Sequence, residues 1–353
     1  MKKQVFGYLF TLSSCTAYAA PMDAFNTIPD FQPDRNLIVN TSFDYFKANS
    51  KAKNDNQRDY TGFTLGSRYI LNPNWYTDLN YWNRTIQYGA SDNDFQSWKL
   101  GLNYVPDFTP STNDTLAFGV SFWGNYADQF DKSSKTKYKN YTLSEASIKK
   151  PQDLQLQLDA IYSKKFNQNN TFNLFANAAY SKVKTEAISG IFSNKNCNFD
   201  IHIDKNNQLT GQLKSPCTLN NTTVNNMTLS ADARQYGVDI QNQLNYDAVI
   251  LGLGANWQWQ YENFKSLIGY NFQYFMRDIP KESFIEQRER TSNHTIALEL
   301  SYAITPEWNV YLQNQFFLHS FTGEIPSLYN PITAAAMDKS YNYVSIGIRF
   351  TPF

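Results

Sequence analysis

The chain has 353 residues, and its 31 acidic and 31 basic side chains give a formal net charge of zero. A balanced charge gives no sign of a nucleic-acid partner, which would require a basic surface. Aromatic residues make up 16% of the chain, yet its mean hydropathy is negative. This combination argues against an ordinary soluble globule and favours a sheet with one apolar face and one solvated face.

The N-terminus predicts a cleaved export signal over residues 1–19. Lys2 and Lys3 form its positively charged start, residues 5–12 are mostly apolar, and residues 17–19 provide a small-x-small cleavage site. The apolar stretch is too short to span a membrane as a helix, so this segment is expected to be removed on export.

The alternative for this region is a lipoprotein signal in which Cys15 is acylated, although its apolar stretch would be very short. Residues 20–34 contain three prolines and no periodicity. They predict a periplasmic N-terminal extension that precedes the folded domain.

From about residue 37 onward, apolar and polar side chains alternate with a period of two, as in residues 154–159 and 257–261. Side chains of a strand alternate between the two faces of a sheet, so this pattern predicts strands with one apolar face. Thirteen segments follow the pattern, near residues 36–46, 60–71, 75–86, 96–105, 115–126, 153–163, 171–183, 234–246, 249–260, 266–276, 295–304, 308–319 and 341–351.

Thirteen strands conflict with the even strand number of bacterial single-chain barrels. Tight turns at residues 72–74 and 305–307 place the discrepancy between about residues 184 and 234. A further strand at residues 222–233 gives about 14 strands, and 12 strands, with a weak segment discarded, is the alternative. The predicted fold is all-β: a transmembrane antiparallel up-and-down barrel over residues 35–353, with long extracellular loops at residues 127–152, 184–222, 277–293 and 320–340.

The export signal, the alternating strands, the short inner turns, the long outer loops and the terminal Phe353 resemble a Gram-negative outer-membrane β-barrel of the porin-like kind. The resemblance is architectural and identifies no subfamily. It implies an outer-membrane location, contact with membrane lipid and lipopolysaccharide, and recognition of Phe353 by the barrel-assembly machinery. Pro352 departs from the pattern because it removes a ladder N–H.

Composition assigns the two faces of the predicted barrel. The odd positions of residues 249–259 are uniformly apolar and are expected to face lipid, where no water satisfies polar groups. The opposite face predicts a lumen rich in amides, with Trp82 and Trp123 and with nearly cancelling charges. The predicted lining residues are Asp44, Arg68, Asp78, Arg84, Lys99, Asp159, Asp239, Glu299, Gln313 and Arg349.

Removal of the signal leaves Cys197 and Cys217, an even pair in an exported chain, which predicts a disulfide. The loop closed by this disulfide, at about residues 184–230, is expected to fold inward and narrow the pore, and a purely external role is the alternative. The basic loop that contains Lys132, Lys135, Lys137, Lys139, Lys149 and Lys150 is a candidate contact for lipopolysaccharide phosphates, or it is a solvated loop.

Catalytic and metal chemistry find little support in the sequence. His202, His294 and His319 do not form the His-x-Ser arrangement of known outer-membrane hydrolases. Residues 92–94 and 200–207 carry oxygen ligands but lack the glycine and the distal glutamate of a calcium loop. We therefore expect neither an enzyme nor a cofactor or metal site.

The sequence predicts a channel for passive or weakly selective diffusion of small hydrophilic solutes. A plugged structural or surface-display barrel that binds extracellular partners is one alternative, and a transporter of hydrophobic compounds is another. The identity of the solute and the oligomeric state stay open.

Overall fold

The computed structural model describes residues 24–30, 35–46, 59–88, 91–107, 113–132, 135–138, 141–194, 197–219, 222–279, 290–319, 324–330 and 340–352. The predicted signal, Cys15, Lys139 and Phe353 lie outside these ranges. No helix within them is long and apolar enough to cross a membrane.

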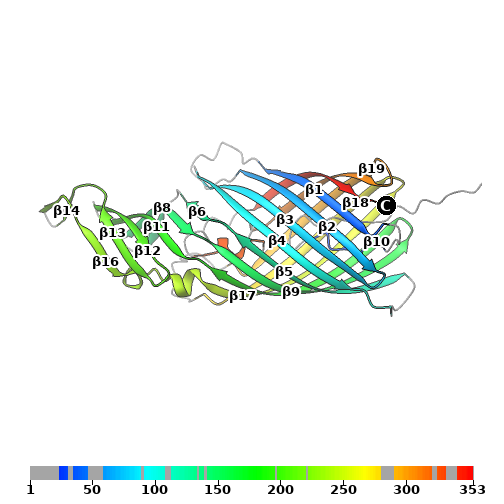
Figure 1. The fold of residues 1–353 in the computed structure, drawn as a ribbon, viewed down its shortest axis with the longest axis horizontal. Coiled ribbons are helices and arrows are strands. Elements are labelled where there is room, and N and C mark those ends of the chain that lie inside the picture. Colours follow the sequence, from blue (N-terminus) through cyan, green and yellow to red (C-terminus); the bar gives the residue numbers. More distant parts are fainter. Residues whose placement is uncertain are drawn as a thin grey trace, which may run out of the picture.

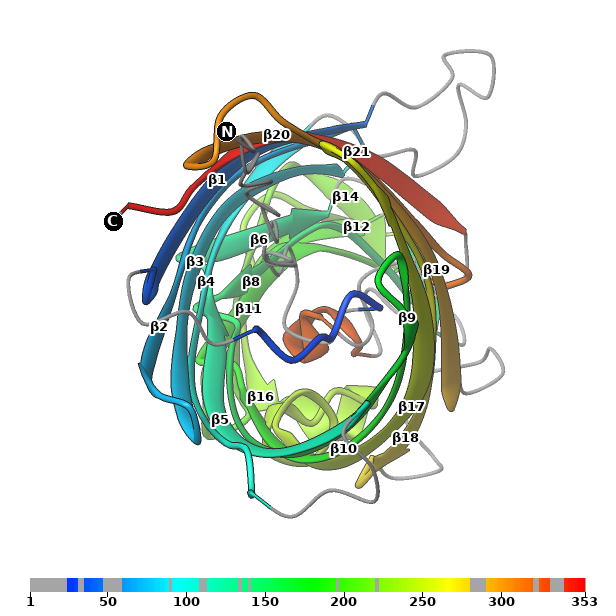
Figure 2. The same ribbon diagram turned by 90° about the vertical axis from the view of Figure 1, so that its right-hand side faces the viewer.

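Twelve antiparallel strands close into an up-and-down barrel, in which the first strand pairs with the last (Figures 1 and 2). The all-β barrel prediction is confirmed, with the alternative count of 12 in place of about 14. The barrel strands are β1 (Leu37–Phe46), β2 (Tyr60–Asn72), β3 (Trp75–Tyr88), β4 (Ser91–Tyr104), β5 (Asp114–Tyr126), β9 (Gln152–Asn167), β10 (Asn170–Lys184), β17 (Tyr246–Tyr261), β18 (Phe264–Arg277), β19 (Ser292–Ala303), β20 (Trp308–Phe317) and β21 (Tyr341–Phe350).

The two ends of the barrel differ in their connections. At one end, here the short-turn end, two to four residues join β2 to β3, β9 to β10, β17 to β18 and β19 to β20. At the other end, the long-loop end, β5 and β9 are joined through β6 (Gln129–Lys132), β7 (Thr136–Tyr138) and β8 (Tyr141–Lys149), and β10 and β17 are joined by a still longer excursion.

The two predicted segments that do not become barrel strands both lie in this excursion. Residues 222–233 contain β15 (Thr222–Val224) and β16 (Thr228–Asp232), which pair outside the barrel. Of the predicted strand at residues 234–246, only Tyr246 lies in a strand, as the first residue of β17. The rest is covered by the 3₁₀-helix η1 (Ala233–Tyr236), the π-helix η2 (Ile240–Leu244) and the residues that connect them, and each helix is capped at its N-terminus by an aspartate side chain. Ile240 and Leu244 are four residues apart and share one buried cluster, which is the spacing of a helix face.

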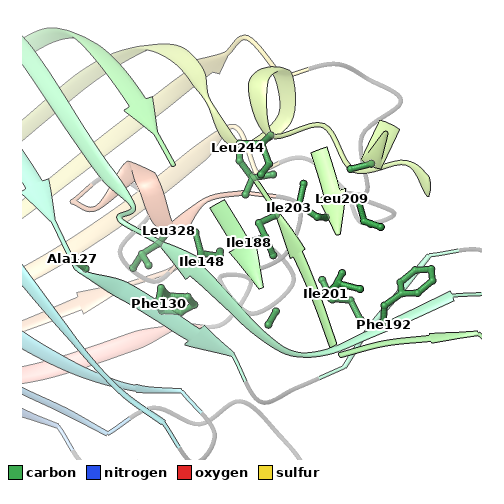
Figure 3. Packing of buried hydrophobic residues seen from close by; sticks show 14 of the residues in the cluster. Ala127, Phe130, Ile148, Ile188, Phe192, Ile201, Ile203, Leu209, Leu244 and Leu328 are labelled. Carbon is green, nitrogen blue, oxygen red and sulfur yellow. The ribbon is translucent and has the colours of Figure 1, made fainter. Parts of the chain in front are cut away.

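A seven-stranded sheet, here the projecting sheet, extends beyond the long-loop end (Figure 1). Its strands β6, β8 and β11 (Ala187–Asn194) continue β5, β9 and β10 after breaks of only two residues. Strands β12 (Cys197–Ile203), β13 (Gln208–Leu213) and β16 extend it further, and β7 pairs with β8. A buried apolar cluster runs along this sheet and includes Phe130, Ile148 and Ile188 (Figure 3).

The predicted disulfide between Cys197 and Cys217 is present, and it joins β12 to β14 (Cys217–Leu219). Its place differs from the expectation, because this region forms the projecting sheet and does not fold into the barrel. Strands β8 and β11 pair along most of their length, so the hydrogen-bonded ladder between β9 and β10 continues beyond the barrel. The disulfide therefore lies outside the barrel, beyond this ladder.

Lys132 lies buried at the end of β6 in the projecting sheet, and this burial lowers its pKa to about 8. An unfolded lysine has a pKa near 10.4, so the unfolded state binds more protons between about pH 8 and 10.4. We therefore expect the free energy of unfolding of the projecting sheet to rise with pH over this window, by about 3 kcal/mol in total.

Urea unfolding at pH 7 and pH 10 measures this effect. Lys132→Met keeps the apolar stem, and it should be more stable than the parent at pH 7 and should lose this part of the pH dependence. Lys205→Met, at an exposed turn, is the matched control and should behave as the parent does. Identical pH dependence in both variants would contradict the assignment.

Candidate functional site

The inward face of the barrel is mainly polar and is interrupted by small apolar clusters, one of which contains Trp123, Ile250 and Phe275. Of the predicted lining residues, those buried on barrel strands are Asp44, Arg68, Asp78, Arg84, Glu299, Gln313 and Arg349, whereas Lys99 and Asp159 are half-buried there. Asp239 does not line the lumen. It is the N-cap of η2, outside the barrel strands, because its segment is helical.

Charges on the inward face largely cancel through direct contacts. The Arg68 Nε atom lies 2.6 Å from the Asp78 Oδ1 atom, and the Asn103 amide donates to the other oxygen of Asp78. Further round the wall, the Arg349 guanidinium lies 3.3 Å from the Glu299 carboxylate, which also accepts a hydrogen bond from the Gln313 amide. The lumen therefore presents little net charge at these positions.

Arg84 contacts an acidic residue that the sequence had placed in an external loop. Its guanidinium lies 2.6 Å from the Glu324 carboxylate, and both side chains are almost completely buried. A second nitrogen of Arg84 donates to the Ser97 hydroxyl. Glu324 begins a buried segment, residues 324–330, which includes the 3₁₀-helix η3 (Pro326–Leu328) and lies inside the long-loop end of the barrel (Figure 2).

This segment, here the loop inner segment, is fixed to the barrel wall at several further points. The Tyr246 hydroxyl donates to the Pro326 carbonyl at 2.6 Å, and the Asn125 amide donates to the Glu324 carbonyl at 2.9 Å. The Ser327 N–H donates to the Asp153 carboxylate. Buried hydrogen bonds and the ion pair thus hold a loop where the prediction placed the disulfide region.

A second segment, residues 24–30, lies across the lumen nearer the short-turn end and is here called the N-terminal inner segment (Figure 2). The Asn256 amide donates to the carbonyls of Ala24 and Asn26, and Phe25 packs in a buried cluster with Leu267. Asp30, at the end of the segment, forms an ion pair with Lys165 at 2.6 Å. These residues belong to the predicted periplasmic extension, and their contacts place them within the barrel.

The amides of the lumen have more hydrogen-bonding capacity than the protein uses. Buried amide oxygens or nitrogens of Gln155, Gln157, Asn177, Gln313 and Gln315 have no hydrogen-bond partner among the residues that the structure describes. Buried polar groups are costly unless they are paired, and water is the usual partner when protein groups are absent. Water molecules inside the barrel are therefore the expected partners of these groups.

The lumen is nevertheless tightly occupied. Asn271 and Gln313 have no exposed surface, and Trp82 and Trp123, both predicted to point inward, are 1% and 0% exposed. Side chains that bordered a wide aqueous pore would be accessible to water. At these positions the interior of the barrel is therefore filled.

Two of the three histidines, His202 and His294, lie outside the lumen contacts described above. The Nδ1 atom of His202 lies 3.0 Å from the Ser189 hydroxyl, on an exposed face of the projecting sheet. In the described part of the chain no carboxylate contacts His202, so the orienting acid of a catalytic triad is missing. His294 contacts the Tyr270 hydroxyl at 2.7 Å. Among the described residues, no group of three or more His, Cys, Asp or Glu side chains is placed to hold a metal ion.

The predicted basic loop is partly neutralised by its own sheet. Lys150 forms an ion pair with Glu186, Lys149 donates to the Gln129 side chain, and Lys132 is buried.

The loop inner segment was missed as a lumen element, although the sequence contains a signal for it. Ile325, Leu328 and Tyr329 are apolar residues in a loop that was predicted to be solvated.

No protein-family model and no curated protein matches the sequence. Solved structures with similar architecture include the translocator domain of the autotransporter NalP from Neisseria meningitidis, with 10% identity, a TM-score of 0.45, and coverage of 89% of this chain and 88% of that chain. The NanC porin has 8% identity and a TM-score of 0.40, with coverage of 89% and 99%. The toluene transporter TodX from Pseudomonas putida has 9% identity and a TM-score of 0.33, with coverage of 91% and 90%. These similarities are too distant to transfer a function, which has to follow from the residues of this chain.

Proposed function

We propose that this protein is an outer-membrane channel for small polar solutes and that the loop inner segment closes it. The observation that carries the proposal is the lumen itself. Most of the buried residues on its wall are amides, hydroxyls and paired charges, with apolar clusters such as that of Trp123, Ile250 and Phe275 between them, and residues 24–30 and 324–330 lie in it.

The outer surface of the barrel supports a membrane location. Leu65, Leu100, Leu158 and Leu253 are about half exposed on it, as expected for side chains that contact lipid. Exposed aromatic residues lie near both ends of the strands, which is typical of membrane interfaces: Trp75, Tyr104, Trp259 and Trp308 near the short-turn end, and Tyr45, Tyr126, Tyr180 and Tyr274 near the long-loop end.

Bacterial barrels have short periplasmic turns and long extracellular loops, so the short-turn end would face the periplasm. The solute class then follows from the wall. Amides offer donors and acceptors to neutral polar molecules such as sugars, and the paired charges give little preference for cations or anions. The polar wall argues against a hydrophobic cargo.

Solute flux into liposomes tests the proposal. Replacing residues 324–330 by a glycine-serine linker of equal length removes the anchoring side chains and keeps the loop. We expect the replaced protein to admit small sugars faster than the parent does, and to exclude larger ones. Equal, background flux for the two proteins would contradict a channel function.

The projecting sheet favours a second function, which is binding of an extracellular partner. A disulfide holds it, and its exposed face carries polar residues such as Ser189, His202 and Thr210. Deletion of residues 190–225 separates the two functions. A display protein would lose cell-surface binding and show only background flux before and after the deletion, whereas a channel would keep a flux above background and its solute preference.

A further inference from the structure

A cavity of about 690 Å³ lies at the long-loop end, where the ends of β10 and β17 meet η1 and η2. Residues Lys182 and Lys184 of β10 border it on one side, and Arg234 and Gln241 border it on the other. It is therefore formed by barrel strands together with the helical segment that replaced the predicted strand at residues 234–246. Of its lining residues, Tyr246 also takes part in the lumen contacts described above, through its hydroxyl group.

Strand register places this cavity at the edge of the apolar outer surface. Tyr180 pairs with Val249, and Val249 pairs with Met276, which makes an apolar row whose members are 37–48% exposed. The next outward-facing row, about 7 Å further along the strands, is charged. In that row Lys182 pairs with Asp247. The surface changes from apolar to charged within one step, as expected at a membrane boundary.

The ammonium groups of the two lysines are accessible to a ligand. Lys182 and Lys184 are exposed, and neither side chain has a hydrogen bond or ion pair within the described part of the chain. Their spacing of two residues places both ammonium groups on the outward face of β10. Arg234 adds a third cation at the cavity, although Asp232 already pairs with it.

The carboxylates at the cavity are less available than the lysines. Asp239 accepts hydrogen bonds from the side chains of Asn207 and Asn242, and Asp247 accepts one from the Tyr180 hydroxyl. Within the described residues the Asp278 carboxylate, at the cavity edge, has no hydrogen-bond donor. The three lining carboxylates match Lys182, Lys184 and Arg234 in number, so the cavity as a whole is close to neutral, and it offers an anionic group the two lysines that lack ion-pair partners. Its amide and carboxylate oxygens are available to hydroxyl groups.

We propose that this cavity binds the phosphorylated sugar headgroup of an outer-leaflet glycolipid, which is lipopolysaccharide in a Gram-negative outer membrane. Lys182 and Lys184 contact a headgroup phosphate. The Asp278 carboxylate accepts hydrogen bonds from sugar hydroxyls, and the Gln241 amide donates to them or accepts from them. The acyl chains run along Tyr180, Val249 and Met276 and the lipid-facing strands below them. The inference rests on the outer-membrane location proposed above and not on conductance, so a barrel that conducts nothing would leave it standing.

Native mass spectrometry of the full-length protein with purified lipopolysaccharide tests the site. Lys182→Gln with Lys184→Gln should weaken binding about 30-fold, which corresponds to about 1 kcal/mol for each lysine. The matched control is Lys205→Gln with Lys214→Gln, which removes the same charge from the projecting sheet, away from the cavity, and should bind as the parent does.

Two further arms identify the group that is recognised. Dephosphorylated lipopolysaccharide should bind the parent as weakly as intact lipopolysaccharide binds the double variant. Inorganic phosphate at millimolar concentration should not displace the intact lipid, because the sugar and the acyl chains contribute to binding. Equal affinity of the two double variants, or displacement by free phosphate alone, would overturn the proposal. Circular dichroism confirms that each variant is folded before the comparison.

Discussion

Replacing Glu324 with lysine is expected to open the channel. The substitution puts a second cation against the buried Arg84 guanidinium, which lies 2.6 Å from the present carboxylate. Loss of one partner of a buried ion pair costs about 3–5 kcal/mol, and a repelling charge adds to that cost. The docked state of the loop inner segment should therefore lose at least about 100-fold in population. Single-channel recording in planar bilayers measures this as an increase in open probability.

The exposed pair between Lys150 and Glu186 supplies the matched control. Its two side chains are about half exposed, and exposed pairs contribute about 0–1 kcal/mol. Glu186→Lys should leave the open probability unchanged. The exchanged pair, Arg84→Glu with Glu324→Arg, should restore part of the closure. If Glu324→Lys and Glu186→Lys behave alike, the ion pair does not hold the channel closed.

Replacing Gly269 with valine is expected to displace the N-terminal inner segment. A Cβ atom at this position would lie 2.2 Å from the Ala24 carbonyl oxygen, and a backbone atom cannot move aside as a flexible side chain can. Overpacking of this kind costs about 1–3 kcal/mol, which corresponds to a population shift of about 5- to 100-fold. A cysteine introduced at buried Thr27 should then react faster with a membrane-impermeant maleimide added at the short-turn end.

Gly101 is the matched control on the same inward face. An added Cβ there would meet no atom closer than 3.6 Å, which is ordinary contact, so Gly101→Ala should leave the labelling of the Thr27→Cys protein unchanged. Faster labelling in the Gly101 variant, or none in the Gly269 variant, would contradict the described position of residues 24–30.

Much of the barrel could be predicted because lipid and lumen impose opposite demands on the two faces of each strand. That demand leaves a period of two in the sequence, and in β17 it extends from Val249 to Trp259 without interruption. It fails at residues 234–246, where polar residues alternate by chance with apolar ones. In that segment, the four-residue spacing of Ile240 and Leu244 and the aspartates that cap η1 and η2 indicate helix and not strand.

The contents of the lumen could not be predicted in the same way, because they depend on contacts between residues far apart in the chain. Arg84 and Glu324 are separated by 240 positions, and Asn256 and Ala24 by 232. No local pattern records such pairs. The disulfide was predicted correctly, but its loop was expected to fold inward, since the period-two pattern does not tell whether a strand stays in the barrel or continues beyond it.

Single-channel recording of the protein in which a glycine-serine linker replaces residues 324–330 should show repeated conductance steps in potassium chloride, with little preference for cation or anion. The parent should show only rare, brief openings. A folded, membrane-inserted protein that shows no steps after this replacement would mean that the loop inner segment does not close a channel and that the barrel is a closed support for the projecting sheet.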